Sequence, residues 1–413
     1  SFNTALGYQA LESNSTGASN TAVGHTALFN STGATNTAVG RASLYTNTAG
    51  TDNVAVGYNA LRLNSTGSYN TALGTDALYT NTSAFNTAVG YQSLYSNTSG
   101  SSNTAVGRNA LRFNTTAIGN TAVGYSALDR NTTGAYNVAV GHQALETNTT
   151  ASFGTALGYQ ALESNTTGAS NAALGYQALF ENTTGFDNVA VGANALDSNT
   201  SGVKNVAIGR NALAANTTTS ANTAIGQEAL SSNTGSDNTA VGYQALRLNT
   251  TGLRNTAIGR DALAANTTAS FNTAIGKEAL KLNTTGTGNV AVGYQALDSN
   301  TTGSSNTVVG QYAGQGITTA AGNTVFGDRA FFSNSTGQQN TAVGQFALYN
   351  NTAANNTSLG FQAGNSITTG TNNTVIGNDA DASSATVSNE ITLGNSSIAA
   401  LRCQVTTITS LSD

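Results

Sequence analysis

The residues best suited to chemistry in this chain are two histidines, a set of dispersed carboxylates and a large number of hydroxyl side chains. His25 and His142 follow copies of the same short motif, and other copies carry Tyr, Arg, Gln or Lys at that place. A catalytic or metal-binding histidine needs a constellation of partners that is not simply repeated, so both histidines are expected to face solvent. No segment concentrates the two carboxylates that a glycosidase places across a cleft. The pattern indicates no enzyme.

The hydroxyl, glycine and cysteine residues give no stronger chemical signal. No base recurs beside the Ser and Thr residues, and no GxxxxGK[ST] phosphate loop is present. Triplets such as Asn14-Ser15-Thr16 and Asn165-Thr166-Thr167 match glycosylation acceptors, but their presence in nearly every copy favours turns and ladders. Cys403 stands alone and is expected to be a small core residue, with a role in linking chains as the alternative. We expect no cofactor and no metal.

Composition excludes further classes of function. The 413 residues include 14 basic and 19 acidic side chains, a net charge of -5 that gives no footprint for a polyanion, so nucleic acid is not an expected partner. No run of about 18 apolar residues is present, so no membrane insertion by a helix is expected. The absence of Met and of a signal-peptide pattern suggests a fragment or a processed product.

The element that must position all of these residues is a tandem repeat. The motif Asn3 to Gly7 recurs through 24 copies, down to a degenerate one at Glu390 to Gly394, at intervals of 17 or occasionally 16 residues. Numbered from its first Asn, the repeat reads N-T-A-V-G-x-x-A-L-x-x-N-T-T-G-x-x. Nearly the whole chain is therefore one array.

Each position of the repeat predicts a role. Alternation at positions 2 and 4 predicts a short strand, such as residues 21–23, with the β-branched side chains buried and Ala at position 3 on the opposite face. The invariant Gly at position 5 indicates a special backbone angle or a close approach between coils. Leu at position 9 and Ala at position 8 predict a second buried layer, and Asn at position 12 predicts a turn. Up to Gly377 every Asp, Glu, Lys and Arg occupies position 6, 7, 10, 11, 16 or 17, so these positions are expected to face water.

These features predict an all-β fold: a repetitive β-solenoid, or parallel β-roll, of 24 coils over residues 1–394, with atypical, capping-like repeats from about residue 310. The Gly and β-branched columns argue against helix, and the absence of Pro excludes collagen. The core is thin, so chains are expected to pack side by side as a homotrimer. Residues 395–413 form a separate C-terminal segment in which alternating residues predict a strand.

Tyrosine recurs at position 6 and would form an outward aromatic row able to stack on sugar rings. Packing between neighbouring coils or chains is the alternative for this row. Its members are Tyr8, Tyr58, Tyr91, Tyr125, Tyr159, Tyr176, Tyr243 and Tyr294.

Two resemblances follow from these motifs. The N-[ST]-V/A-A/V-[IVL]-G core resembles the head repeats of trimeric autotransporter adhesins, which are left-handed parallel β-rolls, although those repeats are shorter and lack the N-T-T-G insert. The whole array, with Glu390-Ile391-Thr392-Leu393-Gly394-Asn395 and Ser410-Leu411-Ser412-Asp413, resembles bacteriophage tail fibre shafts that end at an intramolecular chaperone of the endosialidase type. That resemblance implies trimerisation, cleavage next to the pair Ser412 and Asp413, and a chaperone domain that would follow residues 395–413.

The expected function is structural and adhesive: the shaft of a phage tail fibre, in the virion or outside the cell, that helps attachment to the host surface. Expected partners are two further copies of the chain, a host surface glycan or protein receptor, and other virion tail proteins. A bacterial cell-surface trimeric adhesin or filament is the close alternative. Ice binding through the Asn-Thr-Thr column and a capsule depolymerase are the more distant ones.

Overall fold

A computed structural model describes residues 2–400 of the chain. These residues form a parallel β-solenoid of 24 short strands and contain no helix, which confirms the predicted fold class. The chain divides into two compact units, residues 1–244 and residues 245–413, and each is described by itself. Cys403, the pair Ser412 and Asp413, and nearly all of the strand expected after residue 395 lie outside the described residues.

Every strand has three residues and occupies positions 2 to 4 of its repeat. The unit of residues 1–244 contains β1 (Thr4–Leu6), β2 (Thr21–Val23), β3 (Thr37–Val39), β4 (Val54–Val56), β5 (Thr71–Leu73), β6 (Thr87–Val89), β7 (Thr104–Val106), β8 (Thr121–Val123), β9 (Val138–Val140), β10 (Thr155–Leu157), β11 (Ala172–Leu174), β12 (Val189–Val191), β13 (Val206–Ile208), β14 (Thr223–Ile225) and β15 (Thr239–Val241). The unit of residues 245–413 contains β16 (Thr256–Ile258), β17 (Thr273–Ile275), β18 (Val290–Val292), β19 (Thr307–Val309), β20 (Thr324–Phe326), β21 (Thr341–Val343), β22 (Thr357–Leu359), β23 (Thr374–Ile376) and β24 (Ile391–Leu393).

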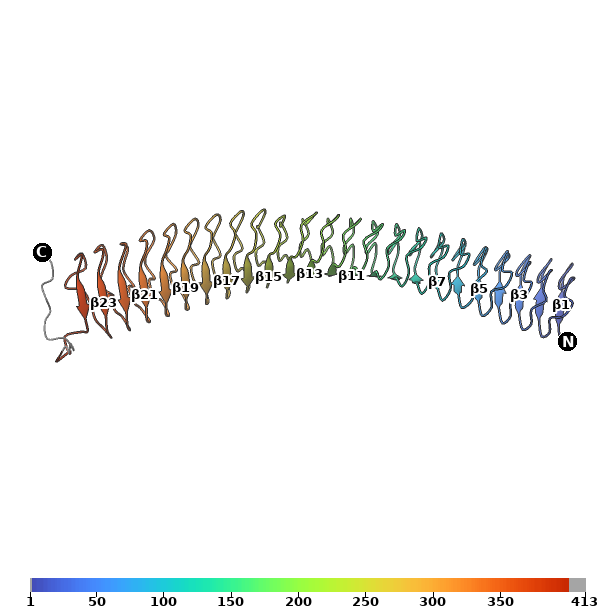
Figure 1. The fold of residues 1–413 in the computed structure, drawn as a ribbon, viewed down its shortest axis with the longest axis horizontal. Coiled ribbons are helices and arrows are strands. Elements are labelled where there is room, and N and C mark those ends of the chain that lie inside the picture. The colour runs from blue at the N-terminus through green and yellow to red at the C-terminus, as the bar shows by residue number, and fades with distance from the viewer. Residues whose placement is uncertain (1, 401–413) are drawn as a thin grey trace. The chain divides into compact units, whose positions relative to one another are not determined.

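Within each unit, successive coils stack so that every repeat position lies beside the same position of the next coil (Figure 1). Thr121 of β8, for example, pairs with Val138 of β9. Backbone hydrogen bonds also join the coils outside the strands: the amide of Leu128 donates to the carbonyl of Ala144 at 3.0 Å, and that of Thr132 to Thr149 at 2.9 Å. Hydrogen bonds between coils therefore run around the whole loop and not along the strand alone.

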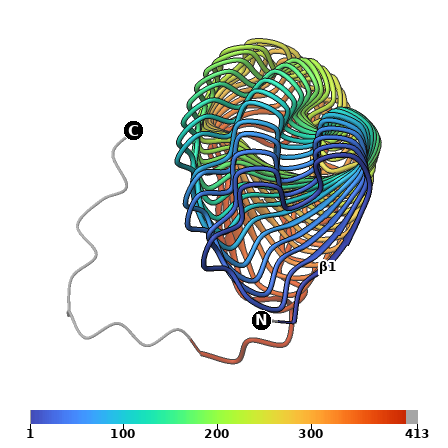
Figure 2. The same cartoon turned by 90° about the vertical axis from the view of Figure 1, so that its right-hand side faces the viewer.

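The interior of each coil is narrow and is filled by a fixed set of positions. In the repeat that begins at residue 120, the fully buried side chains are Asn120, Ala122, Ala127, Leu128 and Asn131. Viewed along the stack, each coil is an elongated loop around this small core (Figure 2). A 17-residue loop has room for Ala, Leu and Asn but for little else.

The orientation predicted for the strand is wrong. The burial patterns show the Ala at position 3 inside, as at Ala122, and the residues at positions 2 and 4 half-exposed or exposed, as at Thr121 and Val123. The physical reason is the width of the loop, which accommodates one small side chain, mostly Ala and in three coils Val, on the inner face of the strand but not two β-branched side chains. The absence of charge at positions 2 and 4 therefore marks an uncharged outer face, with Thr at position 2 in most copies and an apolar residue at position 4.

Besides the glycine at position 5, three residues of each coil adopt left-handed backbone angles, up to the repeat that begins at residue 356, and these make the corners of the coil. In the repeat at 120 they are Ser126, Leu128 and Tyr136, with φ of 52°, 52° and 59°. Left-handed φ costs a residue with a side chain roughly 1–2 kcal/mol, so leucine is an unexpected choice for position 9. Burial of the leucine side chain offsets this strain.

The glycine at position 5 is required both by its backbone angle and by the close approach of the next coil, the two reasons that the sequence suggested. Gly124 has φ of +135°, and a Cβ placed on it would lie 2.3 Å from the carbonyl oxygen of Gly141 in the next coil. That carbonyl belongs to a hydrogen-bonded backbone, since the amide of Gly141 donates to Val123 at 2.8 Å. A larger residue at position 5 would push neighbouring coils apart.

Two buried columns of asparagine link the coils through side-chain amides. At position 12, the Nδ2 of Asn131 donates to the Oδ1 of Asn114 at 3.0 Å, and the Nδ2 of Asn148 to the Oδ1 of Asn131 at 2.7 Å. At position 1, the amide of Asn120 donates to the Oδ1 of Asn103, and its Nδ2 donates to the carbonyl of Gly134. The expected ladder is confirmed, and Asn165, an apparent glycosylation acceptor, is buried in it.

The repeats after residue 310 keep this coil while exchanging core residues. Gly314 and Ile317 stand where other repeats have Leu and Asn, and a Cβ on Gly314 would lie 3.0 Å from the Cδ1 of Ile317. The isoleucine fills the space of the missing leucine but cannot join the asparagine ladder. Consistently, Asn300 Oδ1 and Asn334 Nδ2, in the coils on either side, have no hydrogen-bond partner.

Candidate functional site

The tyrosines singled out in the sequence do lie in one outward column within each unit. Tyr125 is 42% exposed and Tyr176 52% exposed, typical of the column, while Tyr8 in the first coil is 67% exposed. Tyr294 is the one member in the unit of residues 245–413, and it is half-buried. Position 6 follows directly after the glycine at position 5, so the ring leaves the coil at the end of the strand.

Arginine and histidine continue this column and do not interrupt it. The ring of His142 stacks on Tyr125 at a centroid distance of 4.9 Å and on Tyr159 at 5.2 Å, and Tyr159 stacks on Tyr176 at 5.4 Å. The guanidinium of Arg108 lies 5.7 Å from the ring centroid of Tyr125, a cation–π distance. Both histidines are exposed at the surface, as expected, and each takes part in stacking.

Stacking changes what the column can offer to a ligand. A ring enclosed between two neighbours, such as Tyr159, has both faces covered and presents only its edge and hydroxyl group. A sugar ring binds an aromatic side chain through its face. The tyrosines of the column therefore do not all present a ring face. Only a tyrosine beside an interruption of the stack has a ring face open to a ligand.

Sequence reasoning missed a second aromatic column, at position 10 of the second to sixth repeats. Phe29 stacks on Tyr45 at 5.2 Å, and Tyr79 stacks on Tyr95 at 5.1 Å. The guanidinium of Arg62 lies between the two pairs, 5.8 Å from the rings of both Tyr45 and Tyr79. Five successive planar residues at one repeat position were the available signal.

The same position continues as a run of acidic residues. Asp129 is buried and pairs with Arg112 at 3.0 Å, and Glu146 and Glu163 follow in the next two coils. Burial raises the pKa of the Asp129 carboxyl against the opposing effect of Arg112, and burial followed by the charge of Glu146 raises the pKa of Glu163. The carboxylates lie along one column and do not face each other across a cleft, so the arrangement does not provide a glycosidase pair.

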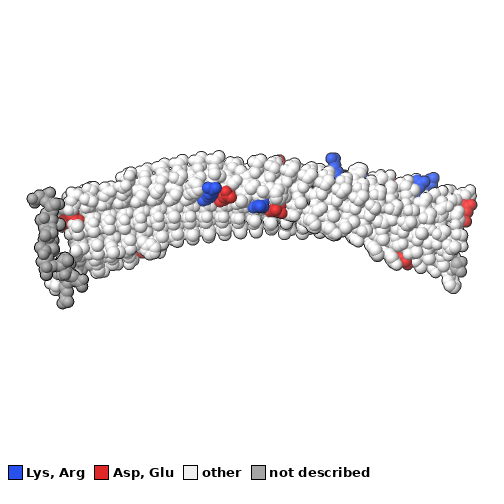
Figure 3. All heavy atoms as spheres, viewed as in Figure 1, with Lys and Arg blue, Asp and Glu red and all other residues white. Residues whose placement is uncertain are grey.

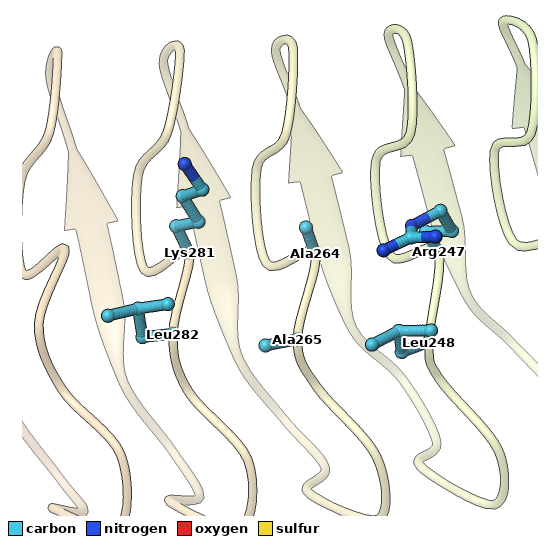
Figure 4. Close-up of a pocket in the computed structure, with 6 residues that line it drawn as sticks. All are labelled: Arg247, Leu248, Ala264, Ala265, Lys281 and Leu282. Carbon is cyan, nitrogen blue, oxygen red and sulfur yellow. The ribbon is translucent and has the colours of Figure 1, made fainter.

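A shallow depression lies on the surface of the unit of residues 245–413. Its volume is about 190 Å³, and it forms where the side chains of one coil are short while those of the coils on either side are long (Figure 4). The lining residues are Arg247, Leu248, Ala264, Ala265, Lys281 and Leu282. The depression is mainly apolar, and its charged side chains are Arg247 and Lys281.

The third surface is the outward face of the strands. No strand residue in the described part of the chain is charged, and position 4 is Val, Leu, Ile or Phe in every copy. These side chains are exposed to an unusual degree for aliphatic residues, with Leu73 at 48% and Ile208 at 38%. Figure 3 shows one face of the molecule, on which charged side chains are few and scattered and large areas carry none.

Comparisons with known proteins give no family for this chain. No protein-family model matches it, and neither does any curated protein sequence. Among residues 2–400 no group of three or more His, Cys, Asp or Glu side chains could hold a metal ion, and no helix has the length and hydropathy to cross a membrane.

Proposed function

We propose that this chain is the shaft of a homotrimeric attachment fibre of the bacteriophage tail-fibre kind, which holds a receptor-binding tip away from the virion and contacts surface glycans itself. The observation that carries the proposal is the charge-free outer face of the strands, which has mostly Thr or Val at position 2 and Val, Leu, Ile or Phe at position 4. Up to Gly377, charged side chains are accepted at six other positions of the repeat but at neither outward strand position. An outward face that excludes charge in every copy is best explained by a partner that covers it.

Identical neighbouring chains are the partner that fits best. Homo-oligomers use closed symmetry, and three parallel copies around a threefold axis would bring the same outward columns together along their full length. Covering about 40 Å² of each position-4 side chain would contribute about 1 kcal/mol per coil before the entropic cost of association. Repetition over many coils turns this small increment into a stable assembly.

The repetitive architecture also suits a spacer. Each coil contacts only its neighbours, so the length of the array grows with the number of repeats without a larger core. Weak glycan contacts repeated over three chains would add avidity. A bacterial cell-surface adhesin would use the same assembly, and it differs in what lies beyond the ends of this sequence.

Native mass spectrometry tests the assembly. We expect a species near three times the chain mass of 41.5 kDa, about 125 kDa. The variant Val123→Lys, which places a charge on the outer strand face of every chain, should raise the monomer fraction measured on dilution. Tyr125→Lys is the matched control two residues away, because position 6 carries Lys277 in another repeat, and it should stay trimeric.

A monomeric wild-type chain at micromolar concentration would refute the fibre proposal. In that case the exposed Thr and aliphatic columns would have to serve a surface other than a second copy, and thermal hysteresis of ice growth would be the next measurement.

A further inference from the structure

The column at position 6 has a single interruption in the first eleven repeats. Ten of these repeats carry Tyr, His or Arg there, and the fifth carries Thr75. The residues on either side in the column are Tyr58 and Tyr91. No ring contact joins Tyr58 to Tyr91, whereas rings of adjacent coils in this column stack at about 5 Å.

A filled version of the same arrangement occurs further along the same unit. His142 lies between Tyr125 and Tyr159, with its ring centroid 4.9 Å from one and 5.2 Å from the other. Two tyrosines separated by one coil therefore leave space for one ring between them, about 10 Å from plane to plane, as expected for two strand spacings of about 4.8 Å. At Thr75 the short side chain leaves that space to a ligand.

The two tyrosines beside Thr75 are held from their outer sides. The guanidinium of Arg41 lies 5.6 Å from the ring of Tyr58, and that of Arg108 lies 5.8 Å from the ring of Tyr91. Each ring thus has a cation on the side away from Thr75 and is about 45% exposed. The faces directed toward Thr75 are the ones that remain for a ligand.

Two polar residues lie at this place in the column. Asp76 follows Thr75, and its amide donates to the carbonyl of Tyr58 at 2.9 Å, a backbone bond between neighbouring coils. One carboxylate oxygen of Asp76 accepts a hydrogen bond from Nδ2 of Asn59 at 3.1 Å. Thr75 itself is half-buried, and its hydroxyl is the group that we expect to bind a hydroxyl group of a ligand.

We propose that Tyr58, Thr75 and Tyr91 form a slot that clamps one pyranose ring of a surface glycan between two phenol faces. The ligand class is a neutral sugar with equatorial hydroxyls, of the β-gluco type, because such a ring presents axial C–H bonds on both faces and hydroxyls at its rim. A planar aromatic ring fits the same spacing, as His142 does between Tyr125 and Tyr159. The choice of a glycan rests on the proposed attachment function.

Saturation-transfer NMR with methyl β-D-glucopyranoside tests the slot on the intact chain. We expect transfer to the glucoside from the wild type, and weaker transfer to methyl β-D-galactopyranoside, whose axial 4-hydroxyl meets one ring face. Thr75→His fills the slot as His142 does and should abolish the signal, whereas Thr75→Ala leaves the slot open and should retain it. Tyr91→Ala should weaken binding about tenfold, as loss of one ring contact of about 1.4 kcal/mol predicts.

The outcomes test the slot proposal and the fibre proposal independently. A Thr75→His variant that binds the glucoside as well as the wild type overturns the slot, as does a folded wild type without saturation transfer. Native mass is measured on the same samples, so a trimer that does not bind refutes the slot alone, and a monomer that binds refutes the fibre alone. Histidine occupies position 6 in two native repeats, so Thr75→His is expected to fold.

Discussion

The exchange of core residues at Gly314 and Ile317 predicts a compensating pair of substitutions elsewhere in the array. In a regular repeat such as the one containing Leu162 and Asn165, either single change should be harmful, and the two together should largely restore packing. Ile367 with Gly364 repeats the natural exchange, with a Cβ on Gly364 only 3.3 Å from the Cδ1 of Ile367. The prediction is therefore drawn from two independent places in the chain.

The magnitudes follow from the contacts. Leu162→Gly removes a fully buried side chain, which costs 2–5 kcal/mol, but relieves the left-handed strain at φ of 54°, so we expect a net loss of about 3 kcal/mol. Asn165→Ile breaks the bond to Asn148 Oδ1 at 3.0 Å and the bond from Asn182 Nδ2 at 2.8 Å, and it crowds Leu162, for a loss of about 3 kcal/mol. In the double variant the isoleucine fills the leucine space and the crowding is relieved, so only the broken ladder remains, at about 2 kcal/mol. The coupling between the two sites is then about 4 kcal/mol.

Hydrogen–deuterium exchange measures this cycle in the intact chain, because a repeat array does not unfold in one step and local opening is the relevant free energy. Peptides that cover residues 155–185 are compared in the wild type, both single variants and the double variant. Each single variant should reduce the protection factor of these peptides. If the double variant reduces it by the product of the two single reductions, the isoleucine does not take the place of the leucine. The reverse pair, Gly314→Leu with Ile317→Asn, is the matched control and should increase protection by restoring partners to the neighbouring asparagines.

Three further predictions concern single residues. Gly158→Ala should destabilise its coil by several kcal/mol, because alanine is strained at a φ of +141° and its Cβ would lie 2.3 Å from a backbone carbonyl oxygen. A Cβ on Gly168, at position 15, would lie 2.1 Å from the carbonyl oxygen of Gly185, but the φ of Gly168 is outside the left-handed region and Ala151 occupies that position in the preceding repeat, so Gly168→Ala should cost much less; exchange rates of the two variants at equal temperature decide this. Gly154→Asn should stabilise the array by about 1 kcal/mol by completing the position-1 ladder, and unchanged protection of the adjacent coils would contradict it. Burial raises the pKa of Asp197 in the folded chain, so the protonated carboxyl group is compatible with folding below its ordinary pKa, and the stability is lost as the pH rises through the raised value and the carboxylate forms. Asp197→Asn should therefore raise Tm at pH 7 and lose this advantage near pH 3, and an equal Tm difference at both pH values would count against it.

The sequence was sufficient for the architecture and insufficient for the direction of its side chains. Periodicity placed every strand, and the glycine and asparagine columns indicated close approach and ladders correctly. The strand face was wrong because absence of charge at Val123 and its equivalents is compatible with burial in the coil and with an outward face that excludes charge. Only the number of residues that fit inside a 17-residue loop decides between them, and that is a property of the closed coil.

The candidate site, too, could be predicted from the sequence only in part. The tyrosine column could be read from the repeat, but the participation of Arg108 and His142 in the stack depends on ring and guanidinium orientations that composition does not reveal. The left-handed angle at Leu128 and its equivalents also had no signal, since leucine is a poor choice for such a corner when judged alone. Thr75 became informative only once its neighbours in space were known.

The in-register pairing of equivalent positions also bears on how such a gene can change. Because each coil presents the same backbone donors and acceptors to the coil before it and the coil after it, loss or duplication of one whole repeat by recombination between similar DNA segments would leave every remaining junction intact. Such an event would alter the reach of the protein in steps of one coil and would also move Thr75 relative to the ends of the array. The length of the array and the place of Thr75 in it would therefore change together in a single genetic step, without a change in packing between coils.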